Sequence, residues 1–308
     1  MRRADMVHLG LMLSALGLAY LLPFELLLLA YAVLGPAHYL TEISWLHDRK
    51  YFLAARPIAV VLAAIAVAAV YVPDVLGSGL LIWIAFVAAA LAIGGVGWTQ
   101  RAILAGILFL VTAALVTGRD FIAVSAVLLP TLIHVSVFTL VFMMLGAYRS
   151  GSRWQVALVL VYLGSVALIL AVPPGSIPHS MPMAQLGFQY FGGVAPALGQ
   201  VLHLPGLTFD SRSTGLLSFV YTYHYLNWFI KADVIGWRRI SPVRLGAIVA
   251  LSAAATGIYF YDYATGFAVL LALSLLHVIL EFPLNTLSIR QLAGIAVQGF
   301  GRQARAAS

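Results

Sequence analysis

The sequence predicts an all-α, polytopic integral membrane protein with about ten transmembrane helices. Of its 308 residues, 63% are hydrophobic and 9% are charged, and the mean hydropathy is +1.02. A water-soluble domain of this length cannot bury that much apolar surface. The chain also contains repeated apolar runs of roughly 17 to 25 residues, the length at which a helix crosses the hydrocarbon core of a bilayer.

The individual spans are predicted from apolar runs that end at turn residues or charges. They lie at 7–22, 24–46, 53–72, 78–97, 102–117, 121–147, 155–173, 214–231, 243–261 and 265–287. The first, second and fifth have the least distinct boundaries, which gives a range of eight to ten. We expect residues 1–308 to form a single transmembrane domain with one long connection, at 174–213.

The basic residues predict the orientation. With the N-terminus in the cytoplasm, all of the 17 Lys and Arg residues except Arg119 and Arg212 fall on the cytoplasmic side, as the positive-inside rule requires. This arrangement places the C-terminus in the cytoplasm and the 174–213 loop outside. The net charge of +7 is thereby explained without a nucleic-acid partner. The expected location is the bacterial inner (cytoplasmic) membrane.

Two histidine–glutamate pairs lie within predicted spans, in His38-Tyr-Leu-Thr-Glu42 and His277-Val-Ile-Leu-Glu281. A spacing of four residues puts both side chains of a pair on one helical face, one turn apart. A carboxylate in the membrane is costly and is normally paired, protonated or bound to a metal. Since the chain has no cysteine, any metal must use imidazole, carboxylate or amide ligands.

Two further histidines, His134 and His224, also lie deep within predicted spans. Counted from the outer end of each span, the four histidines are roughly 10 to 14 residues in, a common depth of about 15 to 21 Å. All four lie on even-numbered spans, which run from outside to inside. A single histidine in a membrane helix is often a packing residue, but this set has the composition of a metal site. The predicted ligands are His38, Glu42, His134, His224, His277 and Glu281.

The proximity of these residues is also predicted. If they form one centre, at least three histidine rings lie within about 8 Å of a common point, and the two carboxyl groups lie within about 10 Å of each other. Candidate supporting residues around the site are His47, Tyr221 and Asn227.

A second, external group of soft donors is formed by His179, Met181 and Met183 in the long loop, and would suit copper. For the buried set, imidazole and carboxylate without thiolate favour non-haem iron, as one or two ions. Zinc, manganese and copper are alternatives, and haem is less favoured because no sequence feature indicates it.

At these residues the chain resembles, at the level of class, the histidine-rich polytopic membrane non-haem metal oxidases and oxygenases. These include fatty-acyl desaturases, alkane and sterol hydroxylases, and bacterial membrane oxygenases that cleave carotenoids. The paired histidine boxes of the desaturases are absent here, so the resemblance concerns the type of site only. It implies an oxidoreductase that acts on a lipophilic substrate, such as an acyl chain, a carotenoid or another isoprenoid, and that uses a separate electron donor.

Two other classes of function fit the same residues. Buried His and Glu could relay protons or bind a cation in a coupled transporter. A histidine base could also serve a lipid-modifying transferase or hydrolase, either with zinc or without metal. Bound metal, flux in proteoliposomes and turnover in a chelator distinguish the three classes.

Overall fold

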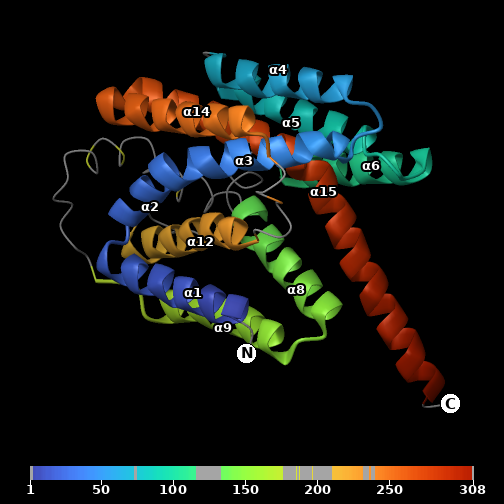
Figure 1. Cartoon of the computed structure of the whole chain (residues 1–308). Coiled ribbons are helices and arrows are strands. Elements are labelled where there is room, and N and C mark those ends of the chain that lie inside the picture. Colours follow the sequence, from blue (N-terminus) through green and yellow to red (C-terminus); the bar gives the residue numbers. More distant parts are fainter. Residues whose placement is uncertain are drawn as a thin grey trace.

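The computed structural model describes residues 3–72, 75–115, 133–175, 210–231 and 240–306, together with the single positions 185, 187, 196 and 236. Within these residues the regular structure is helical, apart from one isolated bridge between Leu53 and Ile93. The all-α prediction is therefore confirmed (Figure 1).

Each predicted span overlaps a helical segment. The segments are α1 (Arg3–Leu21), α2 (Glu25–Leu29), η1 (Ala30–Leu34), α3 (Gly35–Asp48), η2 (Lys50–Phe52), α4 (Pro57–Tyr71), α5 (Val75–Leu91), α6 (Trp98–Leu115), α8 (Thr139–Ser150), α9 (Arg153–Ala171), α12 (Ser211–Ile230), α14 (Pro242–Tyr261) and α15 (Tyr263–Ala306).

Among the described residues, 6 stretches are long and apolar enough to cross a membrane: Ala4–Leu21, Glu25–Asp48, Ile133–Ser150, Arg153–Ala171, Pro242–Tyr261 and Tyr263–Val297. Helices α4, α5 and α6 contribute shorter apolar stretches. The protein is thus a helical protein of the membrane type, and the total of about ten spans stays a prediction.

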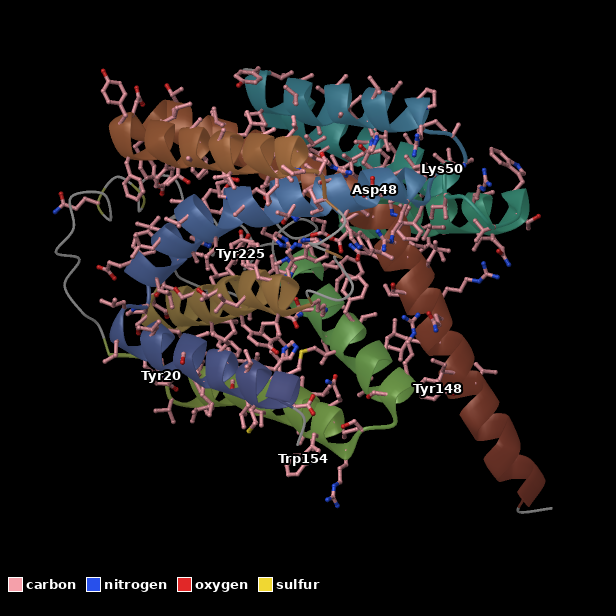
Figure 2. All side chains as sticks on the ribbon, viewed as in Figure 1. Tyr20, Asp48, Lys50, Tyr148, Trp154 and Tyr225 are labelled. Atoms are coloured by element: carbon pink, nitrogen blue, oxygen red, sulfur yellow. The ribbon has the colours of Figure 1, made fainter. Side chains whose placement is uncertain are left out.

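Helix α12 lies inside the helical bundle, where it contacts α1, α2, η1, α3 and α9 (Figure 1). Its first turn is fixed by a capping box, in which the Asp210 carboxylate accepts from the backbone of Ser213 and the Ser213 hydroxyl accepts from the backbone of Asp210. Tyr223 and Tyr225 on this helix are 0% and 1% exposed. In Figure 2, Tyr225 lies within the bundle, whereas Tyr148 and Trp154 lie at its edge.

Helices α3 and α12 run in the same direction, because His38 pairs with His224 and the later Thr41 accepts a hydrogen bond from the later Trp228. Helices α8 and α15 are parallel by the same reasoning. His277 lies against His134, just before α8, and Gln291 accepts a hydrogen bond from Arg149 at the end of α8.

Contacts at the two ends of α1 show that α1 and α9 are also parallel. Near their starts, Gln155 donates a hydrogen bond to the Asp5 carboxylate at 2.8 Å. Near their ends, the Tyr20 hydroxyl donates to the Val172 carbonyl at 2.6 Å. Each contact therefore joins residues that the predicted topology places on the same side of the membrane.

Two π-helical turns accompany the histidine-bearing helices. One covers Ala30–Leu34 and leads directly into α3, whose second residue is Pro36. The other covers residues 133–138 and carries His134. A π turn shifts the helical register by one residue, and such turns often occur at functional sites. Gly35 leaves room for the Tyr39 side chain, whose hydroxyl a Cβ at position 35 would meet at 3.1 Å.

The last helix is longer than predicted. The apolar run suggests an end at residue 287, but α15 continues to Ala306 and includes Pro283. A proline removes one backbone hydrogen bond and bends a helix without necessarily ending it. In Figure 1, the C-terminal part of α15 extends away from the other helices.

Candidate metal centre

Four imidazole rings meet at one point between four helical segments. They come from His38 on α3, His134 on the π turn before α8, His224 on α12 and His277 on α15. Each offers a nitrogen atom that lies within 4.8 Å of the nitrogens of the other three. The predicted proximity of the histidines is therefore confirmed.

The closest contacts between these rings join Nε2 atoms. The distance is 3.2 Å between His38 and His224, and 3.1 Å between His134 and His277. Two nitrogens that bind one metal at about 2.0 to 2.1 Å lie about 2.8 to 3.4 Å apart for octahedral and tetrahedral angles. The observed spacing thus has the size of neighbouring ligand positions around one ion.

Contacts of Nδ1 in His277 and His224 orient the Nε2 atoms of these rings toward the centre of the cluster. His277 donates from Nδ1 to the Ser274 carbonyl at 2.6 Å, which leaves a lone pair on Nε2 of the neutral ring. His224 Nδ1 lies 2.7 Å from the Thr139 hydroxyl. Because a second bond of this kind fixes the ring and tautomer of a metal-binding histidine, Nε2 of each ring is presented to the centre of the cluster.

The two predicted carboxylates lie against the same rings. Glu42 Oε2 is 3.2 Å from His38 Nε2, and Glu281 Oε2 is 3.3 Å from His134 Nδ1. Glu42, His277 and Glu281 form a second group whose ligand atoms lie within 4.8 Å of one another, so the predicted proximity of the carboxylates is also confirmed. Since His277 belongs to both groups, the six residues suit one ion or two adjacent ions.

All six side chains are buried, with at most 8% exposed. Three of their polar atoms make no hydrogen bond among the described residues: His38 Nδ1, His134 Nδ1 and Glu281 Oε2, of which the last two face each other at 3.3 Å. Buried polar atoms without a partner cost free energy and are rare in native structures. A cation at the centre would interact favourably with the Glu281 carboxylate and with the imidazole nitrogens that it binds.

The other candidates predicted from the sequence lie at different places. Asn227 is buried on the wall of the cavity that contains His224. Tyr221 packs edge-to-face on Tyr225, at a centroid distance of 5.9 Å. His47 lies at the exposed end of α3, with Nδ1 3.2 Å from the Tyr51 hydroxyl. His179, Met181 and Met183 lie outside the described residues.

Further residues that support the cluster were not predicted. Thr139 holds His224, and Tyr39 stacks on His277 at 4.4 Å between ring centroids. The Tyr39 hydroxyl is in turn 2.6 Å from the Tyr225 hydroxyl. Tyr39 follows His38 and Tyr225 follows His224 directly, which is the only trace of this arrangement in the sequence.

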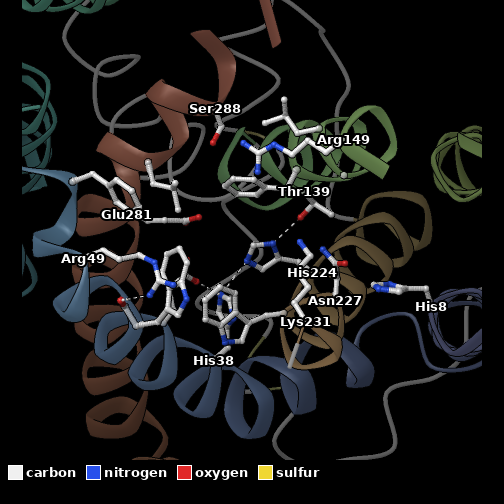
Figure 3. A pocket seen from close by; sticks show the side chains of 18 of the residues that line it. His8, His38, Arg49, Thr139, Arg149, His224, Asn227, Lys231, Glu281 and Ser288 are labelled. Atoms are coloured by element: carbon white, nitrogen blue, oxygen red, sulfur yellow. Dashed lines mark hydrogen bonds and ion pairs between the residues drawn. The ribbon is translucent and has the colours of Figure 1, made fainter. Parts of the chain in front are cut away.

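A cavity of about 510 Å³ opens onto the cluster (Figure 3). His38, Glu42, His224 and Glu281 line its inner part, and α3, α8, α12 and α15 supply most of its walls. The apolar part of the lining consists of Trp45, Phe52, Phe142, Leu145, Trp228 and Leu284. The cluster is therefore accessible to a ligand larger than water.

Comparisons with protein-family models, with curated proteins and with solved structures gave no match. The fold and the site thus define the class of the protein. It is a helical protein with membrane-type apolar helices that enclose a buried His/Glu cluster able to bind a metal ion.

Proposed function

We propose that the protein is a membrane-embedded, metal-dependent oxidoreductase or oxygenase that acts on a lipophilic substrate. Its metal ligands are His38, Glu42, His134, His224, His277 and Glu281. The single observation that carries the proposal is the convergence of four imidazole nitrogens and two carboxylates in a buried space.

The donor set favours iron. Nitrogen and oxygen donors without sulfur suit non-haem iron as well as zinc, manganese or copper, and four histidines with two glutamates would leave open positions on one or two irons. When bound, iron supplies the ability to activate oxygen, while electrons come from a separate donor. The Thr139 and Ser274 contacts would orient the histidines that hold the metal, and apolar side chains line part of the cavity that leads to them.

In this proposal the site lies within a single transmembrane domain, residues 1–308. Both termini are in the cytoplasm, and the 174–213 loop is outside. The contacts at the helix ends support this topology. The Arg244–Asp48 ion pair, at 2.9 Å, joins the end of α3 to the start of α14, and the predicted topology assigns both to the cytoplasmic side. The Tyr20–Val172 contact joins two ends assigned to the outside.

Metal analysis of the detergent-purified full chain tests the ligand assignment. We expect near-stoichiometric iron in the unchanged protein and loss of bound metal in His38→Ala, His134→Ala and His277→Ala. His47→Ala is the matched control, since His47 ends the same helix as His38 but contacts Tyr51. Metal that persists in all three cluster variants, or that is absent from the unchanged folded protein, would contradict the assignment.

Activity requires a separate assay. The iron-loaded protein, supplied with a chemical reductant, is expected to consume oxygen in the presence of acyl lipid, carotenoid or isoprenoid and to release an oxidised product. Turnover that survives complete chelation of the metal would instead indicate the transferase or hydrolase class. Flux that depends on pH in proteoliposomes, with no metal firmly bound to the protein, would indicate a transporter.

A further inference from the structure

The cavity above the cluster changes from acidic to basic along its length. Glu42 and Glu281 lie at its inner end, beside the histidines. Arg49, Lys231 and Arg149 line the part of the cavity that is farther from the histidines. Each of them follows one of the cluster histidines in the sequence, on a helix that leads away from the cluster.

The sequence places Lys231 nearer to the cluster than Arg149. Lys231 is seven residues after His224, and Arg149 is fifteen residues after His134. At 1.5 Å per residue these steps correspond to about 10 and 22 Å along the helix axes. Between the two levels, the apolar side chains of Phe142 and Leu145 form part of the wall.

Neither Lys231 nor Arg149 forms an ion pair with a carboxylate in the part of the chain that the structure describes. Lys231 is partly buried, with Nζ 5.5 Å from the centre of the Phe142 ring. Arg149 donates a hydrogen bond to the neutral amide of Gln291. Arg149 is exposed where it borders the cavity. Lys231 interacts electrostatically with Glu42 and Glu281 at the inner end of the same cavity. A partly buried cation such as Lys231 at this depth is a candidate for contact with a ligand.

The positive-inside rule alone does not explain Lys231. That rule concerns basic residues in solvated loops, and Lys50, the other lysine of the chain, is exposed as it predicts. Lys231 instead follows the last residue of α12 and contributes to the cavity wall. A partly buried lysine in this position is suited to an anionic group of a ligand.

We propose that the cavity binds an amphiphile with an anionic head group, a phosphate or a carboxylate. Lys231 and Arg149 hold the head group, and the apolar part extends along the aromatic wall toward the histidine cluster. This inference rests on the proposed function, because it names the chemical class of the substrate for that same site. It also explains why an apolar cavity has a basic opening.

Equilibrium binding of radiolabelled dodecyl phosphate tests this inference. The full chain is placed in phosphatidylcholine nanodiscs, and binding to empty nanodiscs is subtracted. We expect Lys231→Gln and Arg149→Gln each to weaken binding about tenfold, and Lys231→Arg to restore most of it. The matched controls Lys50→Gln and Arg153→Gln change exposed cations outside the cavity lining and should leave binding within about twofold.

Competition distinguishes an amphiphile from a free anion. Unlabelled dodecyl phosphate should displace the probe at far lower concentration than either dodecanol or inorganic phosphate. Equal displacement by dodecanol would contradict a role for the charge, and equal displacement by inorganic phosphate would contradict a role for the chain. Unchanged binding in both glutamine variants would also overturn the inference.

The metal content of the same samples separates this inference from the proposed function. Binding that depends on Lys231 in protein that retains no metal supports the amphiphile site and removes the metal-dependent function. Full metal content, together with probe binding that does not change when Lys231 or Arg149 is replaced, would support the metal centre and contradict the amphiphile site.

Discussion

Thr139 shows how a single residue prepares the cluster for a metal. Its hydroxyl lies 2.7 Å from His224 Nδ1, so the opposite nitrogen, Nε2, faces His38. Bonds of this kind around a metal site typically contribute 10- to 100-fold to affinity. Thr139 is buried, at 1% exposure, beside the cavity that His224 also lines.

We therefore expect Thr139→Val to lower the affinity for metal by about 10- to 100-fold, while the protein remains folded. Valine keeps the shape of threonine but cannot hydrogen-bond to the ring. Ser165→Ala is the control, because Ser165 is a buried hydroxyl that donates only to the Val161 carbonyl of its own helix. Titration of metal-free protein with iron measures the change, and equal affinities for the two variants would contradict the role given to Thr139.

At this scale the sequence predicted the six cluster residues but not their supports. His38 and Glu42 are recognisable because a polar pair at helical spacing stands out in an apolar span. Thr139 has no such feature, since a threonine in a membrane helix commonly bonds to its own backbone. Its function depends on the contact between the start of α8 and His224 on α12, which the spacing of residues along one helix does not determine.

Among the helices, α12 differs most from an ordinary membrane span. It is absent from the long apolar stretches found in the described residues, because its sequence mixes aromatic and polar side chains such as Tyr223, His224 and Asn227. These residues are buried inside the protein, where they face other helices and not lipid. The sequence located this helix, but the π turns and the length of α15 were not predicted. The π turns depend on tertiary contacts, and the length of α15 depends on whether the helix continues through Pro283.

The turn after α3 contains three consecutive residues in the left-handed region, Lys50, Tyr51 and Phe52, with φ of 52°, 56° and 55°. This conformation costs roughly 1 to 2 kcal/mol for each non-glycine residue. It is held by backbone bonds, including one of 2.7 Å from Gly94 to the Phe52 carbonyl. The turn is therefore strained, and hydrogen bonds from residues outside it hold it in this conformation.

Lys50→Gly should consequently raise the free energy of unfolding by about 1 kcal/mol, because glycine adopts positive φ without a steric penalty. The side chain of Lys50 is exposed, so little packing is lost. Lys50→Ala, which keeps the steric penalty, serves as the comparison. Thermal unfolding in detergent measures both variants; a glycine variant no more stable than the alanine variant would show that this turn is not strained.

At the scale of the whole molecule, four helical segments that are far apart in the sequence reach one centre, and the contacts show that α3 is parallel to α12 and α8 to α15. The sequence predicted that the cluster histidines lie at a common depth on spans of one orientation. It could not predict that these spans are neighbours, because helix packing in a membrane depends on shape and interhelical contacts more than on hydrophobicity. The contacts His38–His224 and His134–His277 supply that information.

The topology leads to a prediction for the intact cell. Reporter fusions near Gly151 and at the end of the chain should report a cytoplasmic position, whereas fusions near Gly175 should report an external one. The reason is the distribution of Lys and Arg between the two sides. A C-terminus found outside would mean that the number of spans is odd, and the shared direction of the histidine-bearing spans would then need another explanation.

X-ray absorption spectroscopy of the purified protein at the edge of its bound metal tests the central claim most directly. We predict a first shell of nitrogen and oxygen at about 2.0 to 2.2 Å, with the outer-shell scattering of several imidazole rings and no sulfur. Such a spectrum would match the ligands that converge between α3, α8, α12 and α15. A first shell that contains no imidazole, in a sample of folded protein, would contradict the assignment of this cluster as a metal centre.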